Sequence, residues 1–135
     1  MIVGGKITKV SAQKMSDDAS STGLGVDISV SGMEAKDGML NVSYKYILEY
    51  QPKKAEMQME GIIYYQGEDK KLSEMAEAWK KSKKLDPAFA EEILNSVAHT
   101  GMVAGTLLSF AIGVPAPIAS QKLAVSQVQP AKKAG

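Results

Sequence analysis

The chain has 135 residues, enough for one domain with a substantial core and too few for two ordinary domains. Its 16 basic and 15 acidic residues nearly cancel, so it lacks the broad positive field that duplex nucleic acid requires, and we expect no nucleic-acid partner. The absence of cysteine excludes disulfides, thiolate metal sites and a cysteine nucleophile. Residues 1–10 lack the long apolar run of a secretory signal, and we expect a cytoplasmic protein.

The first part of the chain predicts two strands joined by a polar connection. Residues 6–15 (KITKVSAQKM) carry the β-branched side chains of a strand, and the spacing of three between Ile7 and Val10 predicts a bulge. Residues 16–23 (SDDASSTG) have the composition of a solvated loop. Residues 25–31 (GVDISVS) alternate apolar and polar side chains, which predicts a half-buried strand.

The next segment predicts a long hairpin. A turn signal at residues 36–38 (KDG) precedes residues 40–51 (LNVSYKYILEYQ), where a period of two is sustained over the whole segment. Residues 52–54 (PKK) form a short connection, and residues 55–66 (AEMQMEGIIYYQ) alternate again. We therefore expect strands three and four to pair.

From residue 69 the period changes to that of helices. Apolar residues recur at helical spacing from Leu72 to Trp79 in a segment without glycine or proline, and this segment ends in a basic run. Asp86 and Pro87 then provide an N-cap acceptor and a proline for the first helical position. The second helix is apolar around much of its circumference, so we expect it to be buried on more than one side and to end at Gly113.

Four strands followed by two helices predict an α+β fold. We expect a four-stranded antiparallel sheet of the Greek-key type with both helices packed on one face. Residues 1–120 would form this single domain, and residues 121–135, polar and rich in Ala and Lys, would form a flexible C-terminal tail.

Residues 97–119 are mostly apolar and about as long as a membrane span. His99, Thr100 and Ser109 interrupt the apolar character, and Pro115 would stop a helix short of a full crossing. These interruptions favour a buried core helix and argue against stable membrane insertion.

Recognisable catalytic and metal motifs are absent from the sequence. His99 is the only histidine, which excludes a histidine-rich metal site within one chain, and a lone histidine in an apolar helix is usually a core or interface residue. The sequence contains no phosphate loop of the Walker kind, no GxSxG, no HExxH and no dinucleotide fingerprint. We predict a protein that is not an enzyme and needs no cofactor.

Eight methionines and five tyrosines are unusual in so short a chain. Methionine adapts to irregular apolar partners and tyrosine combines a flat ring with a polar tip, so a surface rich in both would suit promiscuous recognition of unfolded segments. Core packing explains most of them more simply, since many fall on the inner faces of the predicted strands.

The order of these elements resembles that of the SecB-type export chaperones over nearly the whole chain. The closest local likeness is the second helix, which begins DPAFAEEILNSV at Asp86, runs through Gly101 and leads to the proline-rich exit VPAP at residues 114–117. The last helix of the SecB family carries a similar exit.

The resemblance implies a holdase that binds unfolded or non-native polypeptides without nucleotide and assembles as a dimer or a dimer of dimers. The groove for the polypeptide would draw on sheet residues Tyr44, Tyr46, Met57 and Met59 and on helix residues Leu107, Phe110 and Ile112. Two alternatives remain: a non-enzymatic interaction module with one dedicated partner, and a membrane-peripheral protein that uses residues 107–118.

Overall fold

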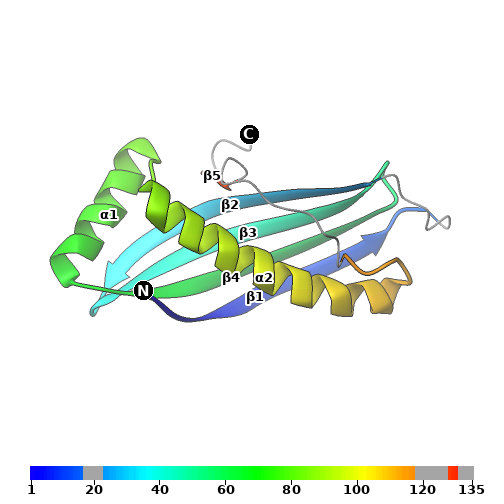
Figure 1. The fold of residues 1–135 in the computed structure, drawn as a ribbon, viewed down its shortest axis with the longest axis horizontal. Coiled ribbons are helices and arrows are strands. Elements are labelled where there is room, and N and C mark those ends of the chain that lie inside the picture. Colours follow the sequence, from blue (N-terminus) through cyan, green and yellow to red (C-terminus); the bar gives the residue numbers. More distant parts are fainter. Residues whose placement is uncertain (17–22, 118–127, 131–135) are drawn as a thin grey trace.

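A sheet of long antiparallel strands forms one layer of the molecule, and two helices cover one face of it (Figure 1). The computed structural model describes residues 1–16, 23–117 and 128–130. The elements are β1 (Ile2–Lys14), β2 (Gly23–Lys36), β3 (Met39–Gln51), β4 (Ala55–Gln66), α1 (Asp69–Ser82), α2 (Pro87–Ile112) and β5 (Val128–Pro130). The strand order is β1-β4-β3-β2-β5. Hairpins connect β2, β3 and β4, and β1, which precedes them in the chain, lies beside β4, which is the predicted Greek-key arrangement.

The turns of the two hairpins lie where the sequence predicted them, and β3 and β4 have nearly their predicted bounds. Asp37 and Gly38 have φ of 52° and 74° and form a two-residue turn between the paired residues Lys36 and Met39. Left-handed conformations at both central positions match the twist of the flanking strands. Along β3 every second side chain, from Leu40 to Tyr50, is buried on the face that carries the helices.

Two strands are longer than their sequence patterns indicated. β1 begins at Ile2 because Met1 and Gln66 exchange two backbone hydrogen bonds, of 3.0 and 2.8 Å, at the end of β4. The predicted bulge in β1 is confirmed as a register shift between Ile7 and Lys9. β2 continues to Lys36 because a second register shift, between Val30 and Gly32, restores its inward alternation after the predicted strand would have ended.

A side-chain cap begins α2, and both helices end at a left-handed residue. The Asp86 carboxylate accepts a hydrogen bond of 3.3 Å from the backbone N–H of Phe89, and Pro87 occupies the first turn of α2. α2 ends at Gly113, whose φ of 71° is in the left-handed region. α1 ends at Lys83, which is also left-handed and whose amino group lies 3.8 Å from the centre of the Trp79 ring.

α2 lies very close to the sheet along a row of small residues. A Cβ atom at Gly101 would lie 2.5 Å from ring atoms of Tyr46, and a Cβ atom at Gly105 would lie 3.5 Å from Leu48. By length and composition alone α2 could also cross a membrane, and 33% of its apolar window is buried in the protein. The expected burial of this helix on more than one side is therefore wrong: one side of α2 packs on the sheet, and the other side is exposed, with Leu107 and Phe110 67% and 73% exposed.

The structure adds one strand to those predicted. β5 pairs in parallel with β2 through residues Ile28, Ser29 and Val30. The rest of the predicted tail from residue 121, and residues 17–22 of the predicted connection between the first two strands, lie outside the described residues.

Candidate functional site

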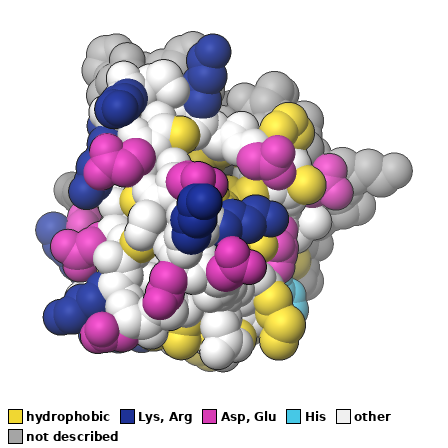
Figure 2. Space-filling model, turned by 90° about the vertical axis from the view of Figure 1, so that its left-hand side faces the viewer, with side chains coloured by type: hydrophobic (Ala, Val, Ile, Leu, Met, Phe, Trp, Pro, Cys, Tyr) yellow, Lys and Arg dark blue, Asp and Glu magenta, His cyan; other side chains and the backbone are white. Residues whose placement is uncertain are grey.

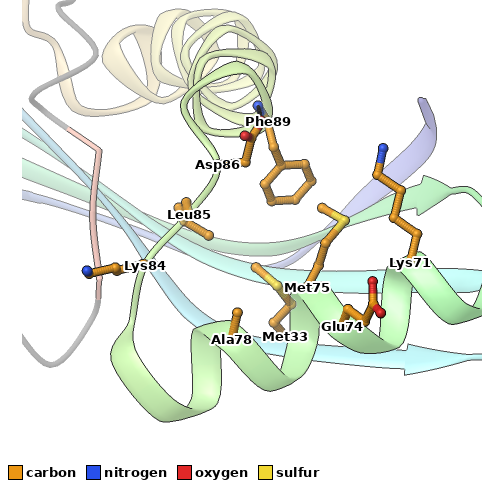
Figure 3. A pocket seen from close by; sticks show the side chains of 9 residues that line it. All are labelled: Met33, Lys71, Glu74, Met75, Ala78, Lys84, Leu85, Asp86 and Phe89. Atoms are coloured by element: carbon orange, nitrogen blue, oxygen red, sulfur yellow. Dashed lines mark hydrogen bonds between the residues drawn. The ribbon is translucent and has the colours of Figure 1, made fainter.

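An apolar pocket of about 270 Å³ lies between α1, the connection to α2, and β2. The hydrophobic side chains of its wall belong to three different elements and to the connection between the helices, and they surround one central space (Figure 3). They are Met33 of β2, Met75 and Ala78 of α1, Leu85 of the connection, and Phe89 of α2. We call this the interhelical pocket.

Local interactions fix the aromatic wall of the interhelical pocket. Phe89 is held by the N-cap bond to Asp86 and by an edge-to-face contact with Tyr65, whose ring centre is 5.0 Å away at an interplanar angle of 86°. Opposite this rigid ring, Met33 and Met75 contribute flexible, polarizable thioethers. One fixed wall and two adaptable ones suit a site that accepts apolar side chains of different shape.

Charged residues of both signs line the rim of the interhelical pocket. Lys71, Glu74, Lys84 and Asp86 complete its lining. Figure 2 looks onto the end of the molecule that carries α1 and shows basic and acidic side chains interspersed there, with hydrophobic side chains in small groups between them. Positive and negative charges are therefore mixed around the rim. The apolar interior distinguishes the pocket from the charged surface around it.

The sheet residues of the predicted groove lie beneath α2. Tyr44, Tyr46, Met57 and Met59 are each at most 4% exposed. Burial raises the pKa of both tyrosines, so both phenols are neutral at physiological pH. They form part of the core in the described arrangement, with α2 closed over them.

The helix residues of the predicted groove lie elsewhere. Leu107 and Phe110 are 67% and 73% exposed, on the outer side of α2, whereas Ile112 packs partly against the core. The structure therefore does not bring the seven predicted residues together in one open groove. Leu107 and Phe110 belong instead to an exposed apolar surface at the C-terminal half of α2, which also includes Met102 and Val103.

The exposed apolar surface of α2 lies beside the edge strand β1. Ser96 and Thr100 of α2 line a pocket of about 390 Å³ together with Ile7 of β1 and Tyr44. Val103 and Leu107 continue the row of Ser96 and Thr100 at helical spacing. Exposed Ile7 and Val10, on β1, thus lie along the same side of α2 as exposed Val103 and Leu107.

The sequence analysis missed the residues of the interhelical pocket. Met33 lies beyond the predicted end of the second strand, and Met75 and Phe89 read as ordinary apolar helix positions. One signal was present: Leu85 is a single apolar residue in the otherwise polar connection between the helices, where burial is not expected without a partner surface.

Within the described part of the chain no group of three or more acidic or histidine side chains could hold a metal ion. His99 is exposed on α2. The chemistry that the described surfaces offer is therefore apolar contact within a charged surround.

Comparison with known proteins identifies the fold. No protein-family model matches the chain, and no curated protein matches it either. Among solved structures, the chain is similar to the SecB-like chaperone of Mycobacterium tuberculosis in complex with a ChAD peptide from the HigA1 antitoxin, with a TM-score of 0.56 and 12% sequence identity. The similarity covers 91% of this chain and 90% of that chain. The order of strands and helices that the sequence predicted is thus confirmed, and the chain has the SecB-like fold.

Proposed function

We propose that this chain is a nucleotide-independent holdase that binds unfolded or partly folded polypeptides. The observation that carries the proposal is the interhelical pocket, which opens between the helices of a SecB-like fold and is walled by Met33, Met75, Leu85 and Phe89. A pocket of this kind accepts an apolar side chain without dictating its shape, because methionine side chains repack at low cost. Unfolded chains expose such side chains and folded proteins bury them.

The polypeptide partner is also supported by the structural neighbour, which was solved with a peptide bound to it. In this chain a polypeptide longer than the pocket would meet a second apolar area on α2, where Leu107 and Phe110 are exposed. Contact with Tyr44, Tyr46, Met57 and Met59 would require α2 to shift on the sheet, since α2 covers them.

Self-assembly into a dimer or a dimer of dimers is part of the proposal. β4 pairs with one edge of β1, and within the described residues no strand pairs with the other. The exposed Val3, Ile7 and Val10 lie on β1. An unpaired edge with apolar side chains is typical of a strand that is covered by another chain.

The direct test is suppression of aggregation of an unfolding model protein by the purified chain without nucleotide, with light scattering to give the oligomer mass. Suppression at near-stoichiometric amounts, extended to several unrelated clients, is the expected result. Binding confined to one partner would replace the holdase with a dedicated interaction module. Flotation with lipid vesicles that survives high salt, in the absence of client binding, would favour a membrane-peripheral protein.

A further inference from the structure

The outer edge of β2 carries a short strand from the C-terminal part of the same chain. Ile28, Ser29 and Val30 pair in parallel with Val128, Gln129 and Pro130. Without β5, β2 would be an edge strand of the antiparallel sheet. Its backbone groups would then be open to any extended polypeptide that adds a strand.

This edge leads directly to the interhelical pocket. Met33, which lines the pocket, follows Val30 on the same strand by three residues, a distance of about 10 Å in extended chain. β5 runs parallel to β2, so a polypeptide extended in the register of β5 advances toward Met33. None of the described residues pairs with the outer edge of β2 from Ser31 to Lys36.

The pairing of β5 is short and therefore weak. It covers three residues of a strand that pairs with β3 over nearly its whole length, and Pro130 has no N–H to donate. A client segment of six or more residues could pair along β2 toward Lys36 and also place a side chain in the pocket. Such a segment offers more hydrogen bonds than β5 does.

The attachment of β5 to the same chain offsets this weakness. Ten residues, 118–127, separate the described end of the domain at Pro117 from β5. A short tether gives a local concentration on the order of millimolar.

We infer that residues 128–130 act as an intramolecular competitor for the strand-addition edge of β2, and that a client polypeptide binds by displacing them. The inference rests on the proposed function and specifies its regulation. Clients with weak or short apolar segments are excluded by the tethered strand, and only segments that extend from Ile28 toward Met33 replace it.

An introduced disulfide can hold β5 in place. The two new thiols can pair only with each other within one chain, because the chain contains no cysteine of its own. Ser29→Cys with Gln129→Cys places two thiols at a directly paired position, within the range of separations that a disulfide spans. The probe is a fluorescent, reduced and carboxymethylated model protein. We expect the oxidised variant to bind it at least about tenfold more weakly than the parent chain, and reduction to restore binding.

The complementary change releases β5. Val128→Pro with Gln129→Pro removes the two remaining N–H groups of the strand and should tighten probe binding about three- to tenfold, as expected if the edge is free between a tenth and a third of the time. Ala124→Pro with Val125→Pro is the matched control and should bind like the parent chain. Faster exchange of those amides of β2 that point toward β5 should accompany the effect in the Val128→Pro with Gln129→Pro variant alone.

The outcomes separate the inference from the proposed function. If the disulfide does not form, or if locking and release leave the affinity of a binding-competent parent unchanged, the competitor role is overturned and the holdase remains. If the parent chain binds no unfolded probe, the proposed function itself fails.

Discussion

Gly101 of α2 lies directly against the ring of Tyr46, and a Cβ atom at Gly101 would lie 2.5 Å from two carbons of that ring. The contact sets how close α2 comes to the sheet, and with it the burial of the sheet residues that the sequence assigned to a groove. A helix held this close leaves no space for a polypeptide between itself and the centre of the sheet.

Gly101→Ala should therefore destabilise the protein. Alanine gains up to about 1 kcal/mol in helix propensity, but overpacking against a buried ring costs about 1–3 kcal/mol, so we expect a net loss of about 1–2 kcal/mol in the free energy of unfolding. Urea denaturation measures it. Gly105→Ala is the matched control, because its Cβ would approach Pro117 at 3.2 Å and Leu48 at 3.5 Å, and it should cost less. Equal losses for the two variants would contradict this account.

Filling the interhelical pocket should weaken client binding without unfolding the protein. Ala78 lines the pocket from an exposed position on α1, so Ala78→Phe places a ring at its mouth. We expect at least about a fivefold loss of affinity for an unfolded model protein, about 1 kcal/mol. Glu77→Phe adds the same ring at the neighbouring exposed position, which does not line the pocket, and should bind like the parent chain. A similar loss in both variants would place the binding site elsewhere.

Phe110→Asp tests the exposed apolar surface of α2. Phe110 is 73% exposed, so the change should alter stability by less than about 0.5 kcal/mol while placing a charge among Val103 and Leu107. We expect more chain to be needed for the same suppression of aggregation. Asn95→Asp, an equally charged change at an exposed position nearer the start of α2, is the control. Unchanged suppression by Phe110→Asp would remove this surface from the client path.

The fold was predictable because each local signal agreed with the tertiary structure. Asp86 and Pro87 begin α2 where capping and proline geometry require it, and the period of two along β3 coincides with its buried face. The extension of β2 was not predictable from alternation alone, because the register shift between Val30 and Gly32 interrupts the period.

The candidate site was harder to predict, for a geometric reason. The groove residues were chosen by apolar character, which does not say whether a side chain faces the sheet or solvent around a helix that is apolar on several sides. Leu107 and Ile112 are both apolar, yet one is exposed and the other packs on the core. The interhelical pocket depends on contacts between Met33 and Phe89, which are far apart in sequence and which no local pattern joins.

The buried tyrosines should make the protein sensitive to alkaline pH. Burial raises the pKa of Tyr46 above its usual value of 10.0, and the same cause acts on Tyr44. The unfolded chain therefore releases the phenolic proton at lower pH than the folded chain does. The stabilisation is fully present below about pH 10 and is lost as pH rises above it, through the folded-state pKa.

Tyr46→Phe removes one of these ionisable groups, so its free energy of unfolding should fall less steeply than that of the parent chain as pH rises above about 10. Urea denaturation at several pH values measures the slope, and comparison with the parent cancels the contribution of lysines. If Tyr46→Phe keeps the parent's slope, the phenol of Tyr46 ionises alike in the folded and unfolded chains, and α2 does not seal it from water as tightly as its contact with Gly101 indicates.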